Sequence, residues 1–126
     1  MREIPDGSDP VELANWLFDL AREGDSARLA AYVDAGAPVD LTDADGNTLL
    51  MLAAYHDHPE TVAALATRGA DVDALNHRGQ SPLAGAVFKQ ADAVIAALLA
   101  AGADPDAGMP TARATAAMFG RPDLFG

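Results

Sequence analysis

Apolar residues recur three and four positions apart along most of this chain, in short runs separated by polar stretches that contain glycine. Two of the clearest runs are Val62, Leu65 and Ala66, then Val94, Ile95, Leu98 and Leu99. This spacing puts the apolar side chains on one side of a helix. The pattern therefore predicts an all-α protein built from short helices joined by polar loops.

The pattern repeats every 33 residues. The segments AYVDAGAPVDL, ALATRGADVDA and ALLAAGADPDA begin at Ala31, Ala64 and Ala97, which are 33 positions apart. Upstream, DADGNTLLMLAA from Asp43 matches NHRGQSPLAGAV from Asn76 at the same spacing. A fourth unit begins within PTARATAAMFGRPDLF, with a preceding loop three residues shorter. A fixed period of this length is typical of a solenoid, in which like units stack.

Each unit predicts two helices. Thr48 or Ser81 has a hydroxyl suited to the start of the first helix, which is short and rich in alanine. The expected breaks between the two helices are Gly24-Asp25, Asp57-His58, Gln90-Ala91 and Gly120-Arg121. The second helix should end near a glycine in the left-handed conformation, at Gly36, Gly69 and Gly102. Because such short helices are marginal in isolation, their stability must come from stacking.

These units resemble the ankyrin repeat, whose pattern is roughly D-x-x-G-x-T-P-L-H-x-A-A-x-x-G-H, a second helix, then L-L-x-x-G-A-D-V-N. DADGNTLLMLAAYHDH and RGADVDA carry the resemblance in one unit, and NHRGQSPLAGAVFK and LLAAGADPDA carry it in the next. The chain departs from the pattern where Met51 and Ala84 replace the first motif histidine and Leu49 replaces the proline. Asp40, Asp73 and Asp106 stand in place of the motif asparagine.

The resemblance implies an α-solenoid of about four ankyrin repeats, the last one truncated. We expect a tail at residues 1–8 and one domain at 9–126, with units at about 9–41, 42–74, 75–107 and 108–126. The first unit resembles an N-terminal cap, whose apolar residues are Val11, Leu13, Trp16, Leu17 and Leu20. At the other end, Leu124 and Phe125 either cover Leu98 and Leu99 or leave an apolar end open for another molecule.

Charge and composition narrow the functional classes. The chain carries 8 Lys and Arg against 19 Asp and Glu, a net charge of −11, which disfavours nucleic acid and anionic membranes. The acidic excess lies in residues 1–73 and either maintains solubility or steers the protein towards a basic partner. There is no cysteine, which excludes thiol chemistry, and the N-terminus has no apolar signal-peptide core. We expect a cytoplasmic location.

The octet AAYHDHPE, residues 53–60, looks most like a chemical site. His56, Asp57, His58 and Glu60 are residue types that bind metals or transfer protons. The repeat register instead places Asp57-His58 at the turn between two helices, with His58 where the ankyrin pattern has its own histidine. We therefore expect His56 and His58 to point in different directions. Paired carboxylates such as Asp71 and Asp73 fall in repeated loops, and we predict no metal, no cofactor and no enzymatic activity.

The resemblance further implies that a protein partner binds to the concave side, formed by the loop tips and the ends of the first helices. The corresponding positions are Arg22, Glu23, Asp45, Asn47, Tyr55, His56, His77, Arg78, Gln80, Phe88, Lys89, Met118 and Phe119. Tyr55, Phe88 and Met118 fall at one repeated position and should form a row. Such large side chains are typical of binding hot spots, although packing between units is the alternative interpretation.

The main hypothesis is thus a non-catalytic module that binds another protein. Two alternatives remain: a subunit that forms a homodimer through its C-terminal end, and a metal-dependent role at His56 and His58. One lysine against seven arginines, with abundant alanine and glycine, is typical of a bacterial gene of high GC content. The identity of the partner is not encoded in any motif, because a repeat fold specifies a surface rather than a function.

Overall fold

The computed structural model describes residues 9–126, and the predicted tail at residues 1–8 lies outside the described part. The helices within it confirm the all-α prediction. They are α1 (Pro10–Glu23), α2 (Ser26–Asp34), α3 (Leu49–Tyr55), α4 (Pro59–Ala66), α5 (Pro82–Phe88), α6 (Asp92–Ala100) and α7 (Ala112–Met118). The described residues contain no β-strand, and Thr42 pairs with Thr48 in an isolated antiparallel bridge.

Hydroxyl side chains begin three of the helices where the repeat predicts them. The Oγ1 of Thr48 accepts the amide of Met51 at 3.0 Å, and the Oγ of Ser81 accepts the amide of Ala84 at 3.1 Å. Thr111 begins α7 in the same way, by accepting the amide of Ala114 at 3.0 Å. These bonds satisfy amides that have no partner inside the helix. The shorter loop before the fourth unit therefore keeps the register of its helix.

The turn within each helix pair also falls where the sequence indicates. One residue of positive φ occupies each of these turns, namely Gly24 at 75°, Asp57 at 65° and Gln90 at 55°, and Gly120 at 72° follows α7 at the corresponding position. This conformation is easy for glycine and unfavourable for residues with a Cβ. The predicted helix-ending glycines Gly36, Gly69 and Gly102 have φ values of 114°, 90° and 90°. The same backbone path is therefore repeated along the chain even where glycine is replaced.

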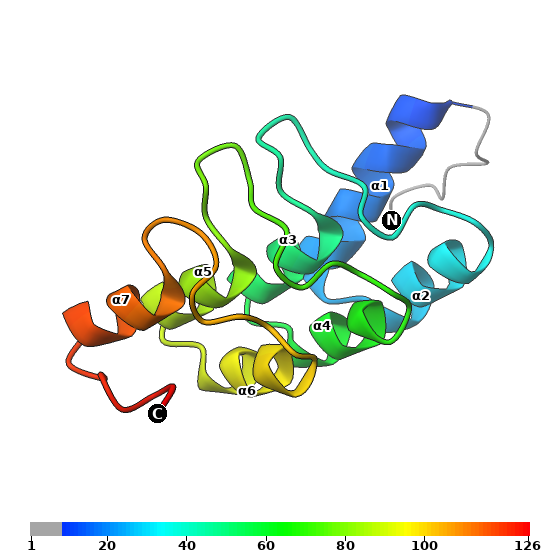
Figure 1. The fold of residues 1–126 in the computed structure, drawn as a ribbon. Coiled ribbons are helices and arrows are strands. Elements are labelled where there is room, and N and C mark those ends of the chain that lie inside the picture. Colours follow the sequence, from blue (N-terminus) through cyan, green and yellow to red (C-terminus); the bar gives the residue numbers. More distant parts are fainter. Residues whose placement is uncertain (1–8) are drawn as a thin grey trace.

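The helices form two layers, which Figure 1 shows along the length of the molecule. The helices α1, α3, α5 and α7 stack in one row, and α2, α4 and α6 stack in the other. The core lies between and within these rows and includes Leu50, Val62, Leu83 and Val94, each fully buried. The loops that join successive units project together from one edge, beside the row that contains α3 and α5.

The first unit packs as a cap, with one exception among its predicted apolar residues. Trp16, Leu17 and Leu20 are buried, and Leu13 is half-buried against the core. Val11, by contrast, is 69% exposed. It precedes Leu20 by nine residues, which is two and a half helical turns, so the two side chains leave α1 on opposite sides. Of the five apolar residues, Val11 therefore lies on the exposed side of α1.

The C-terminal segment after α7 packs on the last helices. Leu124 and Phe125 are half-buried against the core, which agrees with the covering alternative. Arg121 binds the carboxylate of Asp92 on α6 at 2.7 Å, and Arg113 donates to the backbone oxygen of Phe125 at 3.4 Å. No second helix follows α7 within the described residues. Self-association through this end stays a prediction.

Candidate functional site

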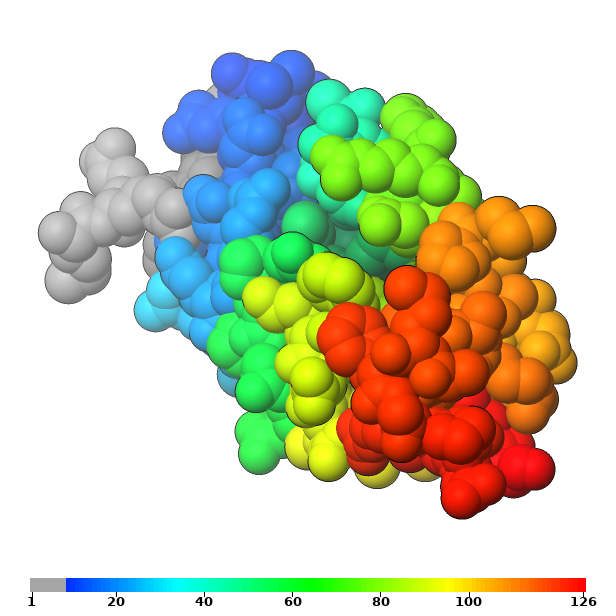
Figure 2. Space-filling model, turned by 90° about the vertical axis from the view of Figure 1, so that its left-hand side faces the viewer, coloured from blue at the N-terminus to red at the C-terminus, as the bar shows by residue number. Residues whose placement is uncertain are grey.

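A cavity of about 620 Å³ opens on the concave side, between α3, α5, α7 and the loop tips that precede them. Figure 2 looks towards this side, where α3 lies recessed between α1, the tip of the loop before α5, and the end of α5. The lining residues are Asp45, Asn47, Met51, Leu52, Tyr55, Asn76, Arg78, Gln80, Ser81, Pro82, Ala84, Gly85, Phe88, Pro110, Thr115, Met118 and Phe119. We call this space the groove cavity.

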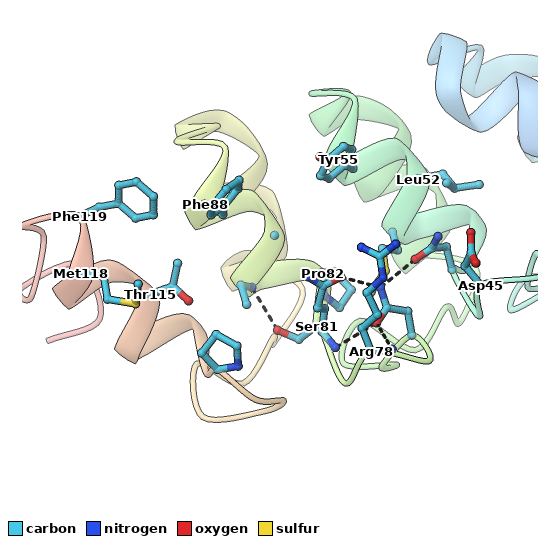
Figure 3. A pocket seen from close by; sticks show the side chains of 17 residues that line it. Asp45, Leu52, Tyr55, Arg78, Ser81, Pro82, Phe88, Thr115, Met118 and Phe119 are labelled. Carbon is cyan, nitrogen blue, oxygen red and sulfur yellow. Dashed lines mark hydrogen bonds between the residues drawn. The ribbon is translucent and has the colours of Figure 1, made fainter.

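The walls of the groove cavity are the large side chains that the repeat predicts as a row. Tyr55, Phe88 and Met118 end their respective helices, and they are 47%, 60% and 76% exposed. These exposures do not fit the alternative that the three side chains complete the core. Phe119 adds a fourth wall by meeting Phe88 edge to face, with ring centroids 5.6 Å apart. Figure 3 shows these residues around the cavity, at the ends of three consecutive inner helices.

The floor of the groove cavity comes from positions one helical turn earlier. Leu52, Gly85 and Thr115 occupy the same place in α3, α5 and α7, three residues before the wall residue of each helix. Leu52 and Thr115 are nearly buried, whereas Gly85 has no side chain and a Cβ added there would meet no atom within 4 Å. The middle of the floor is therefore lower than its two ends.

The polar rim consists of loop-tip residues that are fixed to one another. The side-chain amide of Asn76 donates to the Oδ1 of Asn47 at 3.0 Å and to the Oε1 of Gln80 at 2.9 Å. The backbone amide of His77 donates to the carbonyl of Asp45 at 2.9 Å, which joins the same two loops again. Bonds between consecutive loops hold the rim in place, so that a bound molecule would meet a preformed edge.

The cations of the described chain fall into two groups. Five arginines form salt bridges with aspartates, namely Arg22, Arg28, Arg68, Arg113 and Arg121. Among residues 9–126, Arg78 and Lys89 form no salt bridge. Arg78 lines the groove cavity, and the Nζ of Lys89 lies 4.6 Å from the centre of the Tyr55 ring, at the edge of the same cavity. Arg78 thus lines the cavity, and Lys89 contacts one of its wall residues.

Eight of the residues predicted from the sequence line the groove cavity: Asp45, Asn47, Tyr55, Arg78, Gln80, Phe88, Met118 and Phe119. The other predicted residues, Arg22, Glu23, His56, His77 and Lys89, lie outside its lining. Arg22 borders a separate, shallower depression between α1 and residues 42–45. Whether any of these residues contacts a partner stays a prediction.

The prediction missed the floor. Leu52, Gly85 and Thr115 were not among the predicted site residues, although they precede the wall residues by three positions and so share their side of the helix. Applying the helical spacing to the predicted row would have found them. Pro110 occupies the rim position that corresponds to Gln80, and the three-residue loop deletion hid this relation.

The two histidines of AAYHDHPE have different environments. The Nε2 of His58 lies 2.7 Å from the carbonyl oxygen of Arg22 near the end of α1, which joins the first two units. The ring of His58 also lies so close to Gly24 that an added Cβ would overlap it. His56 is exposed and meets Tyr55 edge to face at 5.8 Å. Burial first, then the charges of Arg22, His58 and Lys89, lowers the pKa of His56.

Within residues 9–126, no group of three or more His, Asp or Glu side chains has the arrangement needed to hold a metal ion. The paired loop carboxylates instead accept backbone hydrogen bonds. Asp40 accepts the amide of Asp71 at 2.9 Å, and Asp73 accepts the amide of Asp104 at 2.8 Å. Within a loop, Asp71 accepts the amide of Asp73 at 3.0 Å. These bonds form a carboxylate ladder that runs from one unit to the next.

None of the described helices combines the length and hydrophobicity needed to cross a membrane.

Two comparisons with known proteins bear on the family. A family model for three ankyrin repeats matches residues 17–109. A Pseudomonas aeruginosa protein described as an ankyrin repeat protein is 49% identical over 51 residues, covering 40% of this chain and 30% of that protein. The chain thus matches less than a third of this bacterial relative's length. The family model matches most of the length of the chain, and the register, caps and stacked helix pairs described above agree with it. The chain therefore belongs to the ankyrin repeat family.

Proposed function

We propose that this chain is a non-catalytic module that holds a segment of another protein in the groove cavity. Ankyrin repeats are in general protein-protein interaction modules. The observation that carries the proposal is the row of Tyr55, Phe88 and Met118, which remains exposed on the cavity wall although each side chain is large and apolar. Exposed aromatic side chains beside a fixed polar rim are typical of binding hot spots. A cytoplasmic location remains a prediction.

The proposal rests also on how little of this face is used by the fold itself. Rigid elements carry the wall residues, and bonds between loops hold the rim, so binding requires little ordering of the protein. The cavity volume of about 620 Å³ lies within the range found for binding pockets. A partner segment entering it would displace water from apolar surface at Leu52, Tyr55 and Phe88, which favours association.

Affinity capture from cells that express the protein tests this function. The bait is compared with the double variant Tyr55→Ala/Phe88→Ala and with the control Leu99→Ala, which removes an exposed apolar side chain from α6, away from the cavity. We expect a protein that binds directly to the wild type and the control, and at least about tenfold more weakly to the double variant. Equal direct binding to all three baits would overturn the proposal, provided that their melting temperatures agree.

A further inference from the structure

Gly85 is the feature of the groove cavity that the fold does not explain. It lies inside α5, and glycine is the least favourable residue in a helix interior except for proline. Close packing does not require it, because an added Cβ would meet no atom within 4 Å, and its backbone has no positive φ. Its absent side chain leaves a hollow between Leu52, Phe88 and Thr115. A glycine that packing does not require is expected where another molecule approaches the backbone.

The charge of the cavity differs from that of the chain as a whole. The chain has a net charge of −11, but the cavity and its edge carry the two unpaired cations, Arg78 and Lys89, against the single lining carboxylate of Asp45. In Figure 3, Arg78 lies between Pro82 and Asp45, on the side of the lining away from Met118 and Phe119. The unpaired cations and the apolar walls therefore border the same cavity.

We propose that the groove cavity receives a large apolar side chain of a partner peptide, and that a carboxylate next to that side chain binds Arg78 or Lys89. The inference rests on the proposed function and specifies the chemistry of its partner: an acidic peptide with an aromatic or leucine anchor. The anchor fills the hollow above Gly85 and contacts Leu52, Phe88 and Phe119. The carboxylate then gives one of the two cations the partner that no aspartate or glutamate of the described chain provides.

The acidic net charge does not prevent this pairing. At physiological salt the Debye length is about 8 Å, so exposed charges farther than this from the ligand are largely screened. The aspartates of the carboxylate ladder are also engaged with backbone amides or with Arg113, rather than lining the cavity. At the cavity, Arg78 and Lys89 have no carboxylate partner among residues 9–126, whereas the carboxylate of Asp43, which also contacts the lining, accepts hydrogen bonds from the amides of Asp45 and Asn47. The groove therefore favours an acidic segment over the basic partner that the net charge suggests.

The environment of His56 agrees with a locally positive field. After burial, the causes that lower the pKa of this imidazole are the neighbouring charges of Arg22, His58 and Lys89. Arg22 is paired with Asp19, so Lys89 is the cation of this set that has no salt bridge within residues 9–126. A carboxylate bound beside Lys89 would enter this field, which is the reverse of what a lysine-rich or arginine-rich peptide would meet.

The test uses a phage-displayed library of random ten-residue peptides, selected on the wild-type protein and on Gly85→Leu. Leucine fills the hollow, and because it is a better helix former with open space for its Cβ, the variant should melt at the wild-type temperature or above. We expect the wild type to enrich peptides with Trp, Phe or Leu within two residues of Asp or Glu. The leading peptide should bind Gly85→Leu at least about tenfold more weakly.

Charge variants separate the two parts of the inference. Fluorescence anisotropy of the leading peptide is measured with Arg78→Gln, Lys89→Gln and the control Arg28→Gln, which removes a positive charge on α2, away from the cavity. We expect the peptide to bind about threefold to tenfold more weakly to Arg78→Gln, to Lys89→Gln or to both. The control should bind it as tightly as the wild type. The loss of affinity should become smaller at high salt, because salt screens the charge interaction. Replacing the peptide's acid by its amide should remove this difference.

The outcomes divide clearly. Enrichment of basic or uncharged peptides whose binding depends on Gly85 and Phe88 would overturn the acidic preference and leave the proposed function in place. Equal affinity for Arg78→Gln, Lys89→Gln and wild type would do the same. If no enriched peptide depends on the groove, both proposals fail. Light scattering that reveals a dimer abolished by Gly85→Leu would place a second copy of this chain in the cavity, and would also overturn the inference.

Discussion

Two regions of this solenoid, the carboxylate-ladder edge and the groove edge, differ in whether their side chains find partners within the chain. Along the edge of the carboxylate ladder, each aspartate meets a backbone amide or an arginine of the chain itself, as Asp73 meets Asp104. Along the groove, Tyr55 and Phe88 extend into open space, and Arg78 has no salt bridge within residues 9–126. The side chains of the first edge form their hydrogen bonds and salt bridges when the chain folds. The second retains interactions that require another molecule.

This difference indicates which residues of the repeat contribute to stability and which remain available for binding. The 33-residue period fixes both edges equally, so the period alone does not distinguish them. What distinguishes them is whether each polar or apolar group has a partner within the chain. Substitutions on the two sides should therefore differ in kind: those at satisfied positions change stability, and those at the groove leave it nearly unchanged.

The largest expected effect sets a core leucine against a groove phenylalanine. Leu83 and Phe88 both belong to α5, but Leu83 is fully buried and Phe88 is 60% exposed. Leu83→Ala should cost about 2–5 kcal/mol of unfolding free energy, because it removes buried methyl groups and leaves a cavity. Phe88→Ala should cost under about 1 kcal/mol. Urea denaturation measures both, and equal losses would remove the distinction between the core and the wall.

The next effect separates the two histidines of AAYHDHPE. His58→Ala should cost roughly 1–2 kcal/mol, because it removes the ring that packs on Gly24 and binds the carbonyl of Arg22. His56→Ala should stay within about 0.5 kcal/mol of wild type, because its ring is exposed. Thermal and urea unfolding of the two variants provide the comparison. A larger loss for His56 would contradict the assignment of His58 as the link between the first two units.

A smaller effect tests the carboxylate ladder. Asp73→Ala should cost about 0.5–1.5 kcal/mol, because the amide of Asp104 loses its acceptor. Asp73→Asn keeps an acceptor oxygen and matches the ankyrin pattern, so it should remain within about 0.5 kcal/mol of wild type. The measurement is the midpoint of urea unfolding for each variant. If alanine and asparagine behave alike at this position, the ladder does not stabilise the stack.

The smallest expected effect is a pH dependence at the groove. The pKa of His56 is lowered from 6.5, so the folded state binds this proton less tightly than the unfolded chain. The stability that its neutral ring provides is present above pH 6.5 and is lost as the pH falls through the lowered pKa. Between about pH 7 and 5, wild type should lose slightly more stability than His56→Gln. Parallel curves from unfolding series at each pH would contradict this.

Much of the fold was predictable because the same sequence signals recur at corresponding positions of successive units. Thr48, Ser81 and Thr111 indicate a helix start at corresponding positions, and in the structure each hydroxyl accepts a backbone amide at the start of its helix. The exposure of Val11 was harder to predict, because the first unit lacks the loop motif that sets the register of the later units. The capping repeat departs from the pattern, so only the helical spacing could have identified its exposed side.

The candidate site was predictable only in part. Wall residues such as Tyr55 and Phe88 could be found because they are conspicuous at a repeated position. Gly85 could not, because a glycine in a helix contributes no visible pattern and its meaning depends on the empty space above it. The isolation of Arg78 and Lys89 was equally hidden. It depends on where every other cation finds its aspartate, which only coordinates in three dimensions reveal.

The carboxylate ladder also makes the molecule extensible. Each link joins an aspartate of one unit to an amide of the next, and the links at Asp40–Asp71 and Asp73–Asp104 span the same number of residues. A further internal unit inserted between two existing ones would thus find an acceptor before it and provide one after it. The groove would gain another wall residue, and an insertion between the first two units would leave the hollow at Gly85 between α3, α5 and α7. In such an architecture, the length of the binding surface can change by duplication without redesigning the joints.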